Sequence, residues 1–295
     1  MTYALKTADA KSLMTHPNSM EVATAAARNV GMPRENLFLV EGEMEGYTTI
    51  RELIELGKDY GEHGQTPTFR IPSGKTNFDV CGFLSFSSGT TGLPKAVMIA
   101  HQNCIAQCLQ IQQITPEDRQ YTPGNAVIAV LPLFHITGLV HALHLPVLLN
   151  ADVVMLPGFT MKSMLDAVVE YQIKELLLVP PILIRMVRDP IVDKYDLSFL
   201  QRFSSGAAPL SEEIIQQLKR KFPHTGLKQG YGMTESCSCI TAHPPAFYDY
   251  KYAHQVGTIC ASTTVKILKE DGTEGGIDEP GEICAKGPQL SLIHI

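Results

Sequence analysis

The sequence predicts an α/β fold in which mainly parallel sheets are flanked by helices, followed by part of a small antiparallel β-barrel. Short apolar runs of strand length alternate along the chain with longer segments of helical spacing. This alternation is typical of parallel sheets covered by helices on both faces. After about residue 236 strand-like segments are instead separated by turn residues. The composition, with 44% hydrophobic and 18% charged residues, is that of an ordinary globular chain with ample core material.

The alternating part supplies five expected strands and four expected helices. The strands are rich in Val, Leu, Ile and Phe and span residues 36–40, 80–86, 126–131, 152–156 and 175–179. Helical spacing is found over residues 21–30, 102–113, 161–171 and 211–222. Ser211 stands before two acidic residues, which is the pattern of a helix N-cap with an acidic first turn.

The last part of the chain is expected to be antiparallel. Residues 263–268 and 281–286 have strand character, and Asp271 and Gly272 form a turn signal between them. We therefore expect these two segments to pair, as in a small barrel.

Composition and charge limit the choice of partners. The formal net charge is -6 and no long run of Lys or Arg occurs. Because nucleic acid is bound largely through cationic contacts to phosphate, we do not expect it as the main partner. No apolar run has membrane-spanning length, and the start lacks the apolar centre of a signal peptide. We expect a cytoplasmic protein, with a peroxisomal location open for a longer parent.

The seven cysteines do not form a metal-binding pattern. Cys104 and Cys108 are expected one helical turn apart, and Cys237 and Cys239 would lie on one face if their segment were extended. Neither pair has the second pair of ligands that a structural zinc site needs. We expect reduced thiols, as in the cytosol.

The strongest functional motif is the segment 85–95, SFSSGTTGLPK, which follows an expected strand. It carries hydroxyl side chains, two glycines and one cation: Ser87, Ser88, Gly89, Thr90, Thr91, Gly92 and Lys95. Glycines let the backbone approach a ligand, the hydroxyls can donate to phosphate oxygens, and Lys95 adds a positive charge for the β- and γ-phosphates. The spacing is not that of a P-loop, because Ala96 stands where that motif needs Ser or Thr. A polar surface loop is the alternative interpretation.

This segment closely resembles the phosphate loop of the adenylate-forming superfamily. That superfamily includes fatty acyl- and 4-coumarate-CoA ligases, beetle luciferases and peptide-synthetase adenylation domains. One departure from its pattern is Ala96, where Gly is more usual. The resemblance implies that the loop binds the phosphates of ATP.

Other segments resemble the same superfamily in the same order. The segment 131–138, LPLFHITG, resembles the one that lines the acyl pocket, where the aromatic residue and the His gate the carboxylate end of the substrate. The resemblance therefore implies that His135 orients the acid. A satisfied structural histidine is the alternative, and we assign that role to His141 and His144 on the following helix.

Two further segments are expected to bind the nucleotide. In SSGAAPL, residues 204–210, the superfamily places adenine against Gly206, Ala207 and Ala208, although the composition alone indicates only a turn before a helix. In QGYGMTES, residues 229–236, two glycines flank an aromatic residue that can stack on adenine. Thr234 offers a hydroxyl to the α-phosphate, and Glu235 is a hard oxygen ligand suited to Mg²⁺. The nucleotide-binding residues expected from this segment are Gln229, Gly230, Tyr231, Gly232 and Thr234.

The resemblance spans nearly the whole chain and implies a division into subdomains. Residues 1–115 correspond to the remainder of a first, incomplete α/β subdomain with the phosphate loop, and 116–245 to a second with the acyl and adenine sites. Residues 246–289 correspond to the barrel portion, and 290–295 resemble nothing in the family. A ribose-binding Asp, a hinge and a C-terminal lid domain with a catalytic Lys are expected of a full member. We find none in this sequence, so we expect a truncated product with impaired thioester synthesis.

The resemblance implies an acid–thiol ligase that uses ATP, Mg²⁺ and CoA. It would activate a small carboxylic acid as its acyl-AMP and transfer the acyl group to CoA, with His135, Lys95, Thr234 and Glu235 as the catalytic residues. The amino-acid sequences of the motifs favour the branch of 4-coumarate and medium-chain acyl-CoA ligases. The alternatives are a non-catalytic nucleotide-binding remnant and a luciferase-like or peptide-synthetase-type adenylation enzyme.

Overall fold

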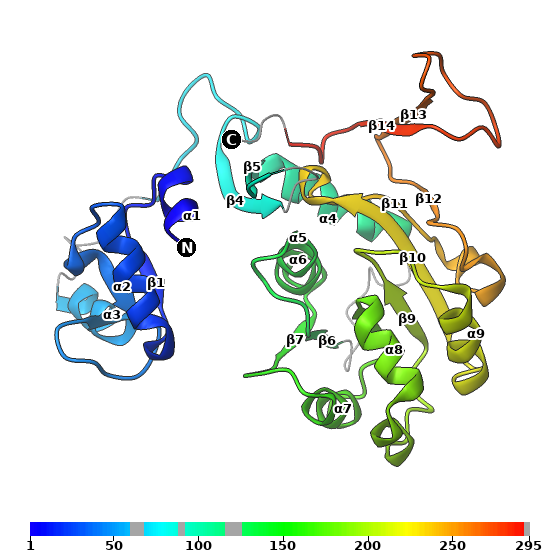
Figure 1. The fold of residues 1–295 in the computed structure, drawn as a ribbon, viewed down its shortest axis with the longest axis horizontal. Helices are drawn as coiled ribbons and strands as arrows, with labels where there is room; N and C mark the ends of the chain where they lie inside the picture. The colour runs from blue at the N-terminus through cyan, green and yellow to red at the C-terminus, as the bar shows by residue number, and fades with distance from the viewer. Residues whose placement is uncertain (60–67, 88–91, 116–125, 292–295) are drawn as a thin grey trace. The chain divides into compact units, whose positions relative to one another are not determined.

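The computed structural model describes residues 1–59, 68–87, 92–115 and 126–291. They form two compact units, of which the first is Met1–Thr76 and the second begins at Asn77 (Figure 1). The expected subdomain boundaries after residues 115 and 245 stay predictions. In the described ranges, no helix is both long enough and apolar enough to cross a membrane.

The first unit is a small parallel α/β layer. Its three-stranded sheet has the order β1-β2-β3, with Leu13 paired to Leu37 and Phe38 to Thr48. Met20, Ala23 and Ala27 recur at helical spacing on α2 and pack with two leucines of β2 in one apolar core. The elements are α1 (Thr2–Thr7), β1 (Leu13–Thr15), a 3₁₀ turn (Pro17–Ser19), α2 (Met20–Asn29), a 3₁₀ turn (Arg34–Asn36), β2 (Leu37–Leu39), β3 (Thr48–Thr49) and α3 (Ile50–Asp59).

The second unit begins with an antiparallel hairpin and alternates thereafter. In chain order it contains β4 (Cys81–Ser87), β5 (Lys95–Ala100), α4 (His101–Ile114), β6 (Ala126–Ala129), α5 (Ile136–Gly138), a π-helical turn (Leu139–His144), α6 (Leu145–Leu149), β7 (Asp152–Met155), α7 (Met161–Glu170), β8 (Glu175–Leu178), α8 (Pro180–Arg188), a 3₁₀ turn (Pro190–Lys194), β9 (Arg202–Ser205), α9 (Glu212–Lys221), β10 (Gly226–Met233), a 3₁₀ turn (Thr234–Ser236), β11 (Ser238–Ala242), two 3₁₀ turns (Pro245–Phe247 and Tyr250–Tyr252), β12 (Thr258–Ile259), β13 (Thr264–Leu268) and β14 (Glu282–Lys286). Strand and helix alternation therefore dominates up to β10, as the sequence predicts.

The largest sheet has the strand order β12-β11-β10-β9-β8. Its pairs β8–β9 and β9–β10 are parallel, whereas β10–β11 and β11–β12 are antiparallel. Separately, β6 pairs with β7 in parallel. The predicted α/β class with parallel sheets, flanking helices and small antiparallel sheets is thus confirmed.

The two faces of the largest sheet differ in character. Leu176, Leu178, Phe203 and Leu227 alternate with their neighbours and are all 0% exposed. They belong to one apolar core with residues of α7, α8 and α9, and α8 lies beside α9 (Figure 1). The intervening residues Glu175, Arg202, Ser204, Lys228 and Gly230 therefore lie on the opposite face. That face contributes to the site described below.

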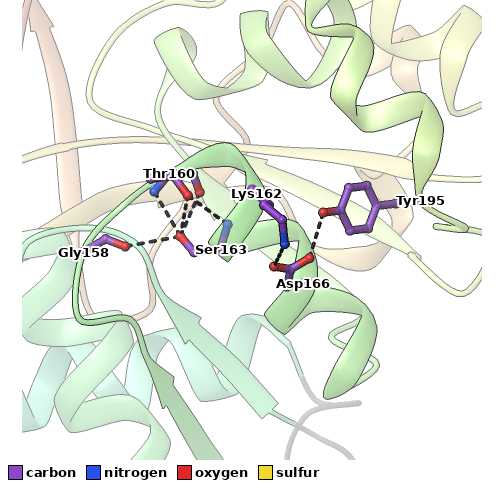
Figure 2. Close-up of polar contacts among 6 residues, drawn as sticks. All are labelled: Gly158, Thr160, Lys162, Ser163, Asp166 and Tyr195. Carbon is purple, nitrogen blue, oxygen red and sulfur yellow. Dashed lines mark hydrogen bonds and ion pairs between the residues drawn. The ribbon is translucent and has the colours of Figure 1, made fainter.

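The helix α7 shows how local sequence sets an element boundary. Thr160 and Ser163 cap its first turn reciprocally, since the Ser163 amide donates to Thr160 Oγ1 at 2.9 Å and the Thr160 amide to Ser163 Oγ at 3.0 Å (Figure 2). In the same turn, Lys162 forms an ion pair with Asp166, which lies one turn further along the helix and also accepts a hydrogen bond from Tyr195 (Figure 2). By contrast, Ser211 does occupy the N-cap of α9 but makes no side-chain cap bond there.

The hairpin β4–β5 and the helix α4 form the frame of the segment that is expected to bind phosphate. Val97 and Ile99 of β5 are fully buried and pack with Cys104 and Ile111 of α4. The segment after Lys95 is therefore a strand and not the helix that a P-loop requires.

The expected antiparallel pair near the end of the chain is also present. β13 pairs with β14, with Thr264 opposite Lys286, and Asp271 accepts a hydrogen bond from the Thr273 amide in the connection. The buried α4 side chain Asn103 donates to the carbonyl of Pro288, which ties the segment after β14 to this helix.

Candidate active site

A cavity of about 970 Å³ in the second unit brings most of the predicted site residues together. Its wall consists of the ends of β4 and β5, the face of the largest sheet that carries Glu175 and Lys228, and the segment around α5. The predicted residues in its wall are Ser87, Lys95, His135, Gly206, Ala207, Gln229, Gly230, Tyr231, Gly232, Thr234 and Glu235. Gly92 and Ala208 are not part of the wall. Ser88, Gly89, Thr90 and Thr91 lie outside the described residues.

The phosphate-loop end of the cavity is organised by the β4–β5 hairpin. Ser87 is the last residue of β4 and pairs directly with Lys95, the first residue of β5. Ser87 Oγ donates a hydrogen bond to Glu235 Oε1 at 3.1 Å. A hydroxyl, an ammonium and a carboxylate are thereby collected at one end of the cavity.

The turn that carries Thr234 and Glu235 is held by the buried Ser236. Its hydroxyl accepts from the Met233 amide at 2.9 Å and lies 2.9 Å from the Ser238 carbonyl, to which it can donate. Cys237 follows with φ of 49°, which reverses the chain into β11. Cys237 therefore belongs to the turn and not to the strand, so it does not share one face of an extended segment with Cys239.

Gly232 is required by the close approach of two strands. The register of β10 against β11 shifts between Tyr231 and Gly232, as at a β-bulge. A Cβ atom on Gly232 would lie 1.5 Å from the Ser238 carbonyl oxygen. The close approach of the β11 backbone thus requires glycine at this position, which also lines the cavity.

The end of β9 carries the residues that are expected to contact adenine. Gly206 has open space where a Cβ would stand, and Ala207 adopts a positive φ of 69° directly after it. Gln229, on the neighbouring strand, is buried, and its side-chain amide donates to the carbonyl of Ala253. Its amide group is therefore engaged by the protein.

His135 occupies the N-cap of α5. Its Nδ1 accepts from the Thr137 amide at 3.3 Å, so the neutral ring carries its proton on Nε2. Gly138 allows this helix to sit against the preceding loop, since a Cβ there would lie 2.1 Å from the Pro132 carbonyl oxygen. Phe134, the expected gating aromatic, is 85% exposed and does not line the cavity.

His141 also lines the cavity, which the sequence interpretation missed. Its Nε2 lies 3.0 Å from Ser238 Oγ and 3.9 Å from Cys239 Sγ. Burial lowers its pKa to about 4, with the charge of Lys228 acting in the same direction and that of Glu175 against it. His141 lies in the π-helical turn Leu139–His144, where the wider turn breaks the spacing from which an α-helix face is predicted.

A charged cluster on the cavity face of the sheet was missed as well. Glu175 pairs with Arg202 and accepts a hydrogen bond from Ser204, and Lys228 Nζ lies 3.5 Å from Glu175 Oε1. Burial raises the pKa of Glu175, but the Lys228 and Arg202 charges outweigh it and hold the pKa at about 2. Alternation along β8, β9 and β10 would have placed the three residues on one face, had β10 been recognised as a strand.

The cysteines are all free thiols. Cys104 and Cys108 lie one turn apart on α4, as expected, and both are buried. Cys104 Sγ lies 3.7 Å from Cys237 Sγ behind the Glu235 turn. In the described part of the chain, no group of three or more His, Cys, Asp or Glu side chains could hold a metal ion.

Comparisons with known proteins identify the family of the chain. The family model described as AMP-binding enzyme matches residues 1–292, so the chain belongs to the AMP-binding enzyme family. It is 39% identical over 238 residues to a protein of Dictyostelium discoideum named probable 4-coumarate–CoA ligase 2, a match that covers 80% of this chain and 40% of the relative. The chain thus spans less than half the length of this relative.

Two solved structures share the fold. A long-chain-fatty-acid-CoA ligase (FadD1) from Archaeoglobus fulgidus superposes with a TM-score of 0.81 at 24% identity, covering 100% of this chain and 56% of that protein. The anthranilate CoA ligase AuaEII, solved with anthranoyl-AMP, superposes with a TM-score of 0.81 at 20% identity, covering 99% and 54%. These similarities confirm the predicted fold of adenylate-forming enzymes.

Proposed function

We propose that this chain carries the site at which a carboxylic acid is activated by ATP to an acyl adenylate, for transfer of the acyl group to CoA. The observation that carries the proposal is the hydrogen bond between Ser87 and Glu235, because it joins the two motifs expected to bind ATP. Lys95, opposite Ser87, and His135 line the same cavity. Family membership and the similarity to 4-coumarate–CoA ligases support the same chemistry.

The proposed first step is attack of a carboxylate oxygen of the acid on the α-phosphorus of ATP. A new oxygen–phosphorus bond forms, and the bond to the bridging oxygen breaks, so that pyrophosphate leaves with the electron pair. Lys95 and the hydroxyls of the phosphate loop would neutralise the β- and γ-phosphates, and Thr234 would donate to the α-phosphate. His135, with its proton on Nε2, would orient the acid by a hydrogen bond. Catalysis of this kind is chiefly positioning and charge neutralisation.

The residues at this end of the cavity fit a magnesium ion that enters with ATP. Glu235 supplies a carboxylate and Ser87 a hydroxyl, and both are hard oxygen donors. Mg²⁺ is commonly held by one or two carboxylates together with the phosphates of the nucleotide. When bound, the ion would screen the phosphate charge that repels an incoming carboxylate. Glu235 is the residue that we propose to hold it.

The second proposed step is attack of the CoA thiol on the acyl carbon, with release of AMP. The relatives that suggest this acceptor are named CoA ligases. A nucleotide-binding chain without turnover is the rival, and an adenylation enzyme with another acceptor is a further alternative.

Acid-dependent exchange between ATP and labelled pyrophosphate tests the proposal, because exchange reports adenylate formation without any thiol. The chain is incubated with ATP, Mg²⁺ and each of a panel of aromatic and aliphatic acids, and CoA thioester formation is followed in parallel. We expect exchange with at least one acid. Binding of ATP without exchange for any acid would support the rival, and failure to bind ATP would refute the proposal.

A further inference from the structure

The cavity face of the largest sheet carries charges at positions where parallel sheets usually carry apolar residues. Strands buried on both faces read as nearly continuous apolar runs. Here Leu176, Phe203 and Leu227 are apolar and fully buried, whereas Glu175 and Lys228 on the other face line the cavity. The charged face therefore belongs to a binding compartment and not to a core.

The charges on this face are bound to one another across three strands. Glu175 of β8 contacts Arg202 and Ser204 of β9 and Lys228 of β10. The side chains of Glu175 and Lys228 retain 27% and 15% of their exposure, so both are largely withdrawn from bulk water while bordering the cavity. A ligand atom placed against this face of the sheet would contact the ammonium group of Lys228 and the carboxylate of Glu175.

The wall with His141 is polar as well. His141 and Ser238 lie within hydrogen-bonding distance of each other at 3.0 Å, and both line the cavity. His141, Lys228 and Glu175 all line this one cavity. His135, to which we assign the carboxylate end of the acid, precedes His141 in the same segment.

We propose that Lys228 and Glu175 form a polar wall of the acid compartment, which selects acids that carry a hydrogen-bonding group beyond their carboxylate over acids with a plain hydrocarbon chain. This inference rests on the proposed function, because it assumes that the acid lies between His135 and this wall. A hydrocarbon tail there would strip water from the charged pair and return no hydrogen bond. A hydroxyl or carboxyl group would replace that water.

The test measures binding of stable acyl-adenylate analogues, in which a sulfamoyl group stands for the phosphate. Three acyl-sulfamoyl adenosines of equal chain length are compared by calorimetry: hexanoyl, ω-hydroxyhexanoyl and adipoyl. We expect the hydroxyl or the carboxyl analogue to bind tighter than the hexanoyl analogue by tenfold or more, on the order expected when a polar site is offered an analogue lacking its partner. Which of the two binds tighter identifies the polar group preferred.

Two variants show whether Lys228 causes the preference. Lys228→Met keeps the length of the side chain and removes the charge, and it should reduce the preference for the polar analogues by tenfold or more. Lys228→Arg keeps the charge and should retain a preference for polar analogues. Lys219→Met, on the exposed surface of α9, is the matched control and should behave as the parent chain. The thermal unfolding transition of each variant verifies that it is folded.

The outcomes separate this inference from the function on which it rests. If no analogue binds, the proposed function fails. If all three bind with equal affinity, the function stands and the polar wall is wrong. If Lys228→Met weakens all three analogues by the same factor, the residue stabilises the sheet and does not select the acid, which also overturns the inference.

Discussion

Ser87 Oγ donates a hydrogen bond to Glu235 Oε1 at 3.1 Å, although 148 positions separate the two residues. The contact joins the last residue of β4 to the turn after β10. A second contact holds the same turn, since the Ser291 amide donates to the Glu235 carbonyl at 2.7 Å. The carboxylate is thus fixed beside the phosphate-loop hairpin, and the following predictions depend on this arrangement.

Replacing Lys95 with Ala should weaken ATP binding. The side chain begins β5 opposite Ser87 and lines the cavity, and a charge-assisted contact to phosphate contributes about 1.5–3 kcal/mol. Calorimetric titration with ATP and Mg²⁺ measures the change. Lys219→Ala is the control for loss of a positive charge at an exposed site. Equal affinity of Lys95→Ala and the parent chain would show that Lys95 does not contact phosphate.

Replacing Glu235 with Gln should remove most of the magnesium dependence of ATP binding. The amide keeps the shape of the side chain and can still accept from Ser87, but it lacks the negative charge of a Mg²⁺ ligand. ATP affinity is measured with and without Mg²⁺ for both chains. Glu274→Gln, in an exposed ion pair with Lys266, controls for the loss of one negative charge. An unchanged magnesium dependence would place the ion elsewhere.

Replacing Gly232 with Ala should destabilise the fold by roughly 2 kcal/mol or more, because the added methyl group would meet the Ser238 carbonyl at 1.5 Å. The backbone of β11 cannot yield without breaking its pairing with β10. Urea-induced unfolding gives the free energy. Gly158→Ala is the matched control, since a methyl group there has no neighbour within 4 Å, and it should change the stability by about 0.5 kcal/mol at most.

Much of the fold could be predicted from the sequence where local pattern and tertiary structure agree. The five expected strands appear as β2, β4, β6, β7 and β8, and the four expected helices as α2, α4, α7 and α9. β10 and β11 were not expected as strands. The sequence GLKQGYGM of β10 contains three glycines and a lysine, which are poor strand formers, and only its pairing on both sides with β9 and β11 makes it a strand.

Site residues that belong to sequence motifs could be predicted, whereas site residues that only tertiary contacts bring to the cavity could not. Lys95, Thr234, Glu235 and His135 stand in motifs and line the cavity, although their roles stay predictions. From the sequence, His141 is assigned a structural role together with His144 on the same helix. Its position in the cavity depends on a π-helical turn and on Ser238, which lies 97 positions away.

The stability of the fold should depend on pH through His141. Its folded pKa is about 4, whereas the ordinary value is 6.5. Between these values the unfolded chain binds a proton at this ring and the folded chain does not. The contribution of His141 to the free energy of unfolding is therefore fully present above about pH 6.5 and is lost as the pH falls toward 4. A shift of this size corresponds to roughly 3 kcal/mol. Burial lowers the pKa of His243 as well, which adds a loss in the same direction.

The contribution of Glu175 to stability is lost at lower pH than that of His141, so the two contributions can be measured separately. Its folded pKa of about 2 lies below the ordinary 4.5, so its contribution is present above about pH 4.5 and is lost only as the pH falls toward 2. The free energy of unfolding in urea, measured between about pH 7 and pH 4.5, therefore reports mainly on the histidines. Below that range Glu175 contributes together with other carboxylates whose pKa is lowered, such as Asp166 and Asp189.

The variant His141→Gln isolates the contribution of this one ring. A glutamine amide can reach Ser238 Oγ as Nε2 of the histidine does, but it does not titrate. Because the loss from His141 is removed, the stability of this variant should fall less between about pH 6.5 and pH 4.5 than that of the parent chain, with the remainder due to His243. His224→Gln, at an exposed position, should keep the full pH dependence of the parent. Parallel curves for His141→Gln and the parent would show that folding does not lower the pKa of His141, and the assigned effect of its burial would then be wrong.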